Sequence, residues 1–380
     1  DEKNHWLPPD NYQEDPEPKI AHRTSPTNIG LYLLSVISAR DMGYLTSRAA
    51  VEVIEKVFLT IKGMAFHEGH LLNWYDTQTL EPLYPKYVSL VDSGNFAGYL
   101  LVVKQTAAHF LNEGELLDGS FKEGLRITLQ IIEGEIKNLS KQKQTTISVS
   151  AHHLLSQLQE CQKLVEMSSM NHLHEWFLSL KNLRGNLDDM RDSIAALEYD
   201  HGAHPYRRLK SWVDSVLEQV SQLQEDLDLY VPWSSGFLSP LHDIFRAQSD
   251  ELHNQWTGLL RNLHGSLIFK KMPEAYEKAV VELQSLDANV QAKANLSTDN
   301  LKEFQQHLDD FKRSLTQSKN NIETLLEKVR RIRGLSEEVF QKMNFRFLLD
   351  KERNVFTIGY NVSEGRHDNA FYDLLASEAR

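Results

Sequence analysis

The chain has 380 residues with 41 Lys or Arg and 53 Asp or Glu, a formal net charge of −12. Because no basic block interrupts this balance, the composition argues against nucleic acid or an anionic membrane as a partner. Cys161 is the only cysteine, which excludes a disulfide framework and a thiolate metal cluster and fits a reducing compartment. No run approaches the ~18 apolar residues of a membrane span and no signal peptide opens the sequence, so a soluble segment is expected.

The first 113 residues are rich in Pro, Gly, Asn, Trp and Tyr, gathered in short clusters. The polar run His22–Gly30 precedes a predicted apolar helix over Leu31–Ala39, with Thr27 or Asn28 as its N-cap. A second cluster covers residues 73–77, and a third, residues 91–95, precedes a predicted helix over Phe96–Phe110. Each cluster is predicted to be a polar loop that leads into a helix.

Aromatic faces beside amides and carboxylates are typical of a sugar site. Trp74 and Tyr75 stand between Asn73 and Asp76, so flat rings for C–H faces adjoin acceptors for hydroxyl groups. The alternative is that the clusters are helix caps and turns with incidental aromatics, because caps and turns use the same residue types.

Residues 114–335 have the periodicity of long helices. Apolar residues alternate by three and four from Leu173 to Leu197 and from Leu301 to Ile332, with shorter runs in 125–139 and 213–230. A period of about 3.5 residues over several turns predicts coiled-coil-like or long-bundle packing. We interpret this part as an antiparallel helical insertion of four to six helices, the last of them capped by Ser297 or Thr298.

No metal site is predicted. Adjacent and i+2 histidines, as in His152–His153 and His172/His174, point to different sides of a helix and have no further ligands nearby. The spacing of His67 and His70 is one residue short of the zinc-binding HExxH pattern. We expect neither a metal nor a cofactor.

The last forty or so residues again contain short clusters of polar and aromatic residues, like the first 113. Apolar runs on either side of Asp350–Arg353 predict a β-hairpin. A final helix follows, in which Glu378 shares one face with Phe371, Leu374 and Leu375. A carboxyl group on an apolar face has a raised pKa and is suited to donate a proton near neutral pH. The alternative is that a glutamate so close to the chain end is frayed and exposed.

Five motifs in order resemble the central, glycoamylase-like domain of bacterial cyclic β-1,2-glucan synthases, and Leu7–Pro16 matches the lead-in of that domain. The motifs are His22–Ser35, Asn73–Thr77, Tyr87–Asn95, Phe356–Val362 and Tyr372–Arg380. The resemblance covers roughly residues 1–110 and 340–380, and the helical middle matches only in its position as a variable insertion.

This resemblance implies an all-α fold: a partial (α/α)6 toroid built from residues 1–113 and 336–380, with a short hairpin near the C-terminus and residues 114–335 as a coiled-coil-like insertion. It implies ring closure of linear β-1,2-glucan by anomer-retaining transglycosylation, with Glu378 as general acid/base. The family's nucleophile would lie in a motif beyond Arg380, so the chain is expected to be a fragment that is inactive alone.

The expected glucan groove combines the clusters at both ends of the chain. Its predicted substrate-binding residues are Asn28, Asn73, Trp74, Tyr75, Asp76, Asp92, Asn95, Tyr360, Asn361 and Tyr372. The resemblance further implies glycosyltransferase and phosphorylase-like domains in the same parent polypeptide, at the cytoplasmic face of the bacterial inner membrane. Two other functions stay open: a β-1,2-glucan hydrolase on the same toroid, and a non-catalytic helical scaffold.

Overall fold

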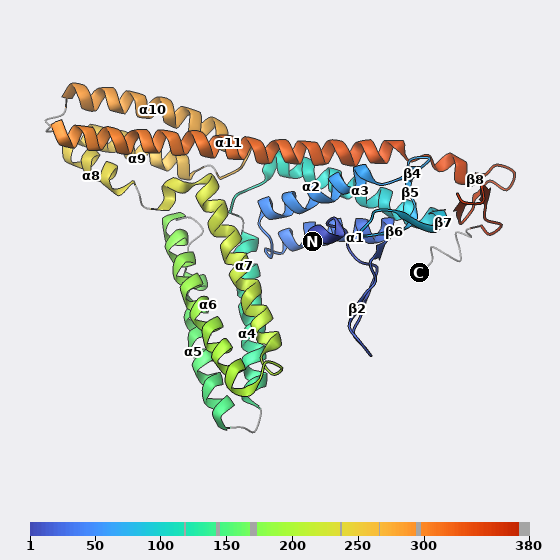
Figure 1. Cartoon of the computed structure of the whole chain (residues 1–380). Helices are drawn as coiled ribbons and strands as arrows, with labels where there is room; N and C mark the ends of the chain where they lie inside the picture. Colours follow the sequence, from blue (N-terminus) through green and yellow to red (C-terminus); the bar gives the residue numbers. More distant parts are fainter. Residues whose placement is uncertain are drawn as a thin grey trace. The chain divides into compact units, whose positions relative to one another are not determined.

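The computed structural model describes residues 1–117, 119–141, 145–167, 173–235, 238–265, 267–293 and 298–371. Over these ranges the chain is mostly helical, with eleven α-helices and small antiparallel sheets (Figure 1). The helices are α1 Pro26–Asp41, α2 Ser47–Gly63, α3 Leu90–Glu113, α4 Gly119–Ser140, α5 Thr145–Met167, α6 Leu173–His201, α7 Arg207–Tyr230, α8 Ser239–Gln248, α9 Asp250–His264, α10 Met272–Lys293 and α11 Thr298–Lys342.

Contacts divide the described chain into two compact units. Unit 1 comprises Asp1–Ala39, Ala50–Asn112 and the described part of Glu327–Arg380, and unit 2 comprises Arg40–Ala49 and the described part of Glu113–Leu326. Both the toroid and the boundaries at residues 113 and 336 stay predictions.

Unit 1 contains a five-stranded antiparallel sheet in the order β11-β10-β7-β6-β3, which the all-α prediction did not foresee. Its strands are β3 Arg23–Thr24, β6 Asn73–Asp76, β7 Pro82–Ser89, β10 Gly359–Asn361 and β11 Arg366–His367. Residues 73–76 therefore form a strand rather than the predicted loop. Tyr87 on β7 pairs with Asn73 on one side and with Asn361 on the other, which joins the two ends of the sequence.

The remaining strands form two-stranded ribbons. They are β1 Tyr12–Gln13 with β2 Lys19–Ile20, β4 Phe66–His67 with β5 His70–Leu71, and β8 Leu349–Asp350 with β9 Val355–Phe356. The last pair confirms the predicted hairpin. Three short 3₁₀ helices complete the described elements: η1 Glu2–Asn4, η2 Pro232–Ser235 and η3 Phe345–Leu348.

Two serines begin the helices that bring the polar clusters together. Ser25 Oγ accepts a hydrogen bond from Asn28 N at 3.2 Å at the start of α1, and Ser89 Oγ accepts one from Asp92 N at 3.2 Å at the start of α3. The predicted N-cap at Thr27 or Asn28 is therefore wrong, because α1 already begins at Pro26. Helix α3 likewise begins at Leu90 and not at Phe96, so Asp92 and Asn95 lie within its first two turns.

Unit 2 holds the long helices. Consecutive helices from α4 to α7 pack against one another and α4 also packs against α7, and Figure 1 shows the four side by side. Helices α8 and α9 contact α11 through aromatic rings: Phe245 packs on Phe304, and Trp256 packs on Phe311.

The apolar periodicity of the long helices is buried as predicted. In α6 the positions Leu173, Trp176, Leu180, Leu183, Leu187, Met190 and Ile194 are at most 1 % exposed. The count of four to six helices is wrong, since the described parts of 114–335 contain eight, α4 to α11. Coiled-coil packing stays a prediction, and Ser297, one of the two proposed caps of α11, lies outside the described residues.

Candidate functional site

A polar cluster lies where helices α1 and α3 begin, in unit 1. Its first part is centred on Asp10. Arg23 donates to Asp10 Oδ2 from Nε at 3.0 Å and from Nη2 at 2.8 Å, and Asn28 Nδ2 donates to Asp10 Oδ1 at 3.3 Å. The Arg23 guanidinium also lies 4.9 Å from the centre of the Trp74 ring. Asp10 thus has both carboxylate oxygens engaged, while the Arg23 guanidinium lies over one face of the Trp74 indole.

The second part of the cluster joins strand β6 to helix α3. Asn73 Nδ2 donates to Asp92 Oδ2 at 2.8 Å, and Asn95 Nδ2 donates to Thr27 Oγ1 at 3.5 Å. Asn73 is next to Trp74 in the chain, and Asn95 lies one turn after Asp92, so the two parts are continuous. We call the whole set the helix-mouth cluster: Asp10, Arg23, Thr27, Asn28, Asn73, Trp74, Asp92 and Asn95.

The chemistry of the helix-mouth cluster suits a hydroxyl-rich ligand. Amides offer both donors and acceptors, carboxylates accept from hydroxyl groups, and an indole provides a flat face. Asp92 lies in the first turn of α3, where the partial positive charge of the helix N-terminus stabilises a carboxylate. Asn73 Oδ1 is buried and has no hydrogen-bond partner among the described residues. A buried polar atom of this kind is an acceptor that a ligand or a water can satisfy.

Tyr75 and Asp76 are adjacent to the cluster but have structural roles. Tyr75 is fully buried, and its hydroxyl donates to Ala65 O at 2.5 Å and accepts from Leu72 N at 2.8 Å. Burial raises the pKa of Tyr75, so the hydroxyl stays protonated. The ring therefore faces the core and presents no surface to a sugar.

Asp76 ends strand β6 and closes a turn. Its Oδ1 accepts from Gln78 N at 2.8 Å and from Thr79 N at 2.9 Å. The hydrogen bond from Thr79 N is the main reason that the pKa of Asp76 lies below its ordinary value. Asp76 thus stabilises the β6–β7 connection.

Tyr360 and Asn361 lie on β10, two strands from β6. Tyr360 stacks on His67 with ring centroids 5.3 Å apart and meets His367 edge-on at 5.0 Å. Asn361 Oδ1 accepts from Glu364 N at 3.1 Å and closes the turn to β11. The contacts that link the helix-mouth cluster do not extend to either residue.

Glu378 and Tyr372 lie outside the described residues. The assignments of Glu378 as acid/base and of Tyr372 as a substrate contact therefore stay predictions. Asp10 and Arg23 are not among the predicted site residues, although Asp10 lies in the lead-in Leu7–Pro16 and Arg23 in the motif His22–Ser35. Their position in those motifs was the signal that could have identified them.

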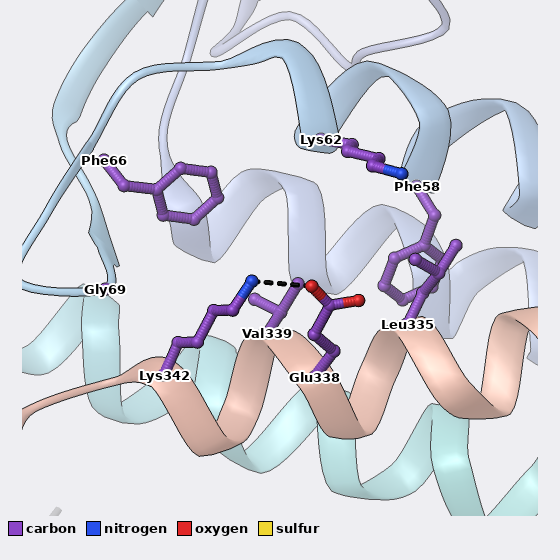
Figure 2. A pocket seen from close by; sticks show the side chains of 8 residues that line it. All are labelled: Phe58, Lys62, Phe66, Gly69, Leu335, Glu338, Val339 and Lys342. Carbon is purple, nitrogen blue, oxygen red and sulfur yellow. Dashed lines mark hydrogen bonds and ion pairs between the residues drawn. The ribbon is translucent and has the colours of Figure 1, made fainter.

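A separate pocket of about 500 Å³ lies in unit 1 between α2, the β4–β5 ribbon and the end of α11 (Figure 2). Figure 2 shows Phe58 and Phe66 at its sides and Val339 on α11, with the Glu338–Lys342 ion pair, 2.6 Å long, in front of them. Gly69 is required there, because a Cβ atom at this position would lie 1.8 Å from Lys342 O. Of the predicted site residues that lie within the described ranges, none lines this pocket.

Three other kinds of functional feature concern residues outside the cluster: a reactive thiol, a metal site and a membrane span. Burial raises the pKa of the Cys161 thiol to about 12, which removes it as a nucleophile. Within the described ranges, no group of three or more His, Cys, Asp or Glu side chains is placed to hold a metal ion. No helix in the same ranges combines the length and apolar character needed to cross a membrane.

Comparison with known proteins gives an informative match. The chain is 28 % identical over 378 residues to the cyclic beta-(1,2)-glucan synthase NdvB of Rhizobium meliloti (strain 1021). The match covers 100 % of this chain and 10 % of the length of that protein. No protein-family model matches the chain.

The extent of this match corrects one expectation. The resemblance was expected to stop near residue 110 and to resume near 340, yet the alignment runs through the helical middle as well. Residues 114–335 are therefore part of the similarity and not only an insertion in the same place. Along its whole length, this chain is related in sequence to a segment of a cyclic β-(1,2)-glucan synthase, the family that its ordered motifs predicted.

Proposed function

We propose that this chain is part of a carbohydrate-active enzyme that closes linear β-1,2-glucan into rings, and that the helix-mouth cluster binds a stretch of that glucan. The observation that carries the proposal is the convergence of Trp74, two carboxylates and three amides on one place, in a chain related throughout to a cyclic β-(1,2)-glucan synthase. Hydroxyl groups of a sugar can exchange hydrogen bonds with the amides and carboxylates, and a C–H face can pack on the indole.

The proposed reaction is a retaining transglycosylation. One carboxylate attacks the anomeric carbon, and Glu378 protonates the departing glycosidic oxygen, which leaves a covalent glycosyl-enzyme. Glu378 then accepts the proton of the hydroxyl at the non-reducing end of the same glucan, and that oxygen attacks the anomeric carbon to close the ring. The resemblance to the synthase family implies that the nucleophile is a glutamate of a later motif. In retaining enzymes the nucleophile and the acid/base lie about 5 Å apart.

Ring closure requires that the glucan be held bent. When both ends of one chain are bound near the same carbon, the reaction is intramolecular and gains from a high effective concentration. The helix-mouth cluster is proposed to hold one end, since its groups come from four chain segments fixed by helix starts and strand pairing.

The surroundings of this segment belong to the same proposal. We place it in a parent polypeptide that also carries a glycosyltransferase and a phosphorylase-like domain, at the cytoplasmic face of the bacterial inner membrane. The β-1,2-glucan made by the first domain would be the substrate of ring closure.

The test is product analysis with the parent polypeptide that contains this segment. Linear β-1,2-glucan is the substrate, and Glu378→Gln is compared with Glu352→Gln, a matched change at an exposed position. We expect rings from the parent and from Glu352→Gln, and a loss of about 10²–10⁴ in rate for Glu378→Gln with an unchanged melting temperature. A Glu378→Gln variant as fast as the parent would refute the acid/base assignment. Short linear oligosaccharides in place of rings would identify a hydrolase.

A further inference from the structure

A groove of about 800 Å³ lies in unit 2, and none of its lining residues belongs to the helix-mouth cluster. It is formed by the first half of helix α7, by Ile131 on α4 and by the connection between α1 and α2. Two aromatic residues line it, Trp212 from α7 and Tyr44 from the connection, and both are partly exposed.

The walls of this groove are fixed without a ligand. Gly43 has a φ of 78°, and a Cβ atom there would lie 2.0 Å from Ser120 O, so the connection packs directly on the start of α4. A Cβ atom on Gly124 would lie 2.4 Å from Gly43 O, which shows the same close approach from the other side. Arg48, at the start of α2, pairs with two residues of α7, with Asp226 at 2.5 Å and with Glu225 at 2.6 Å. Tyr44 is therefore held between two anchored points.

The polar lining of the groove is rich in amides. Gln219 is 6 % exposed, and its Nε2 makes one long hydrogen bond, 3.4 Å, to Thr128 Oγ1. Its Oε1 has no hydrogen-bond partner among the described residues. Gln222 lies one turn away, donates to Glu218 at 2.9 Å and accepts weakly from Thr46 N at 3.5 Å. The two long contacts, at 3.4 Å for Gln219 and 3.5 Å for Gln222, leave amide groups that a bound molecule can satisfy better.

The charges along the groove cancel. Two cations, Arg207 and Lys210, stand with two anions, Asp214 and Glu218. A balanced lining gives no strong preference for a charged ligand. Aromatic faces, amides and both signs of charge together fit a neutral molecule with many hydroxyl groups.

We propose that this groove is an accessory binding site for a neutral oligosaccharide, and that its ligand is a stretch of β-1,2-glucan. The identity of the sugar rests on the proposed function, whereas the site itself rests on the lining of the groove. Trp212 and Tyr44 supply the stacking faces, and Gln219 and Gln222 exchange hydrogen bonds with hydroxyl groups. A second site for one polymer raises the local concentration of glucan and strengthens binding through multivalency.

The test measures binding of a short linear β-1,2-gluco-oligosaccharide to the parent polypeptide by isothermal titration calorimetry. We expect two classes of site. Trp212→Ala weakens one class about tenfold, a loss of about 1.4 kcal/mol, because the aromatic platform is removed. Tyr44→Ala weakens the same class, and Tyr199→Ala, at a position 92 % exposed on α6, leaves both classes unchanged.

The outcomes separate this inference from the proposed function. If Asp92→Ala removes one class while Trp212→Ala and Tyr44→Ala leave both intact, the accessory site is refuted and the helix-mouth site stands. If Trp212→Ala removes a class although the parent makes no rings, the accessory site stands and the proposed function falls. Trp212→Phe, which keeps a ring, is expected to retain most of the affinity. Should Trp212→Ala unfold by circular dichroism, Tyr44→Ala decides the question, and unchanged binding by it refutes the site.

Discussion

The side-chain amide of Asn73 on strand β6 donates a 2.8 Å hydrogen bond to Oδ2 of Asp92 in the first turn of helix α3. The bond joins two segments that the sequence analysis assigned to one sugar site and places them in direct contact. Of the two helices that begin at the cluster, α3 has an acidic residue in its first turn and α1 does not. The hydrogen bond therefore connects the acidic helix start to β6, the strand that carries Trp74.

Replacing Asp92 tests whether its charge acts on the ligand or only on Asn73. We expect Asp92→Ala to lower the free energy of unfolding by about 1–3 kcal/mol, because Asn73 loses its partner in a partly buried place. Asp92→Asn keeps an acceptor for Asn73, so most of that stability returns, while the affinity for β-1,2-glucan stays low because the carboxylate is gone. Leu101→Ala, at a 45 % exposed position of the same helix, is the control. Full affinity in Asp92→Asn would show that Asp92 only positions Asn73.

Trp74 and Tyr75 are neighbours in the chain with different expected roles. Successive side chains of a strand point to opposite faces, and here Tyr75 enters the core while Trp74 stays partly exposed beside Arg23. We expect Tyr75→Phe to lower the free energy of unfolding by about 1–3 kcal/mol, through loss of its bond from the buried Leu72 N, with no change in glucan affinity. Trp74→Ala is expected to weaken glucan binding instead. Urea denaturation and titration calorimetry distinguish the two, and reduced affinity in a folded Tyr75→Phe variant would contradict these roles.

The contrast between these two aromatics shows what the sequence could and could not predict. The buried stripe of α6 follows from local periodicity, which the sequence contains in full. The strand at residues 73–76 depends on pairing with Arg23–Thr24 and with β7, and β7 in turn pairs with residues 359–361. Such pairings are set by the tertiary fold, so the local cluster of polar residues alone predicts a loop.

The same limit applies to the site. Motif residues identified Asn28, Asn73, Trp74, Asp92 and Asn95, and these do lie in one connected cluster. They did not identify Asp10, whose contact with Arg23 spans 13 positions of the chain. Nor could they separate Asp76, a turn residue, from the acceptors that face the cluster, because Asp serves both purposes.

The ionisation of Asp76 is expected to make the free energy of unfolding depend on pH. Its folded-state pKa lies below the ordinary value of 3.8, chiefly because Thr79 N donates to the ionised form. A depressed pKa contributes stability that is present above the unfolded-state pKa and is lost as the pH falls through the folded-state value. We therefore expect Asp76→Asn to be less stable than the parent near neutral pH, and the difference to shrink as the pH falls below about 4. Unfolding free energies measured across this range check the sign, and a difference independent of pH would exclude the charge as its cause.

The Arg48–Asp226 pair offers the strongest test of how unit 2 holds the connection that carries Tyr44. Asp226 has a side chain that is 2 % exposed, and Arg48 Nε lies 2.5 Å from its Oδ1. Removing one partner of a buried ion pair costs about 3–5 kcal/mol, since the other charge stays in a place of low polarity. We expect Arg48→Met to be destabilised by an amount near the lower end of that range, because the Arg48 side chain is 15 % exposed.

The double variant Arg48→Met/Asp226→Leu is expected to be more stable than either single variant, because no unpaired buried charge remains and the packing volume is kept. Glu225, the second partner of Arg48, has a side chain that is 62 % exposed and can be solvated by water. Thermal unfolding of the four proteins gives the coupling energy directly. The accessory groove supplies a second readout: loss of the anchor frees the connection, so Arg48→Met should weaken oligosaccharide binding at the Trp212 site while leaving the Asp92 site intact. If the two single variants added without coupling, the ion pair would not hold the connection, and the preformed wall beside Tyr44 would have to depend on the close contact of Gly43 with Ser120 alone.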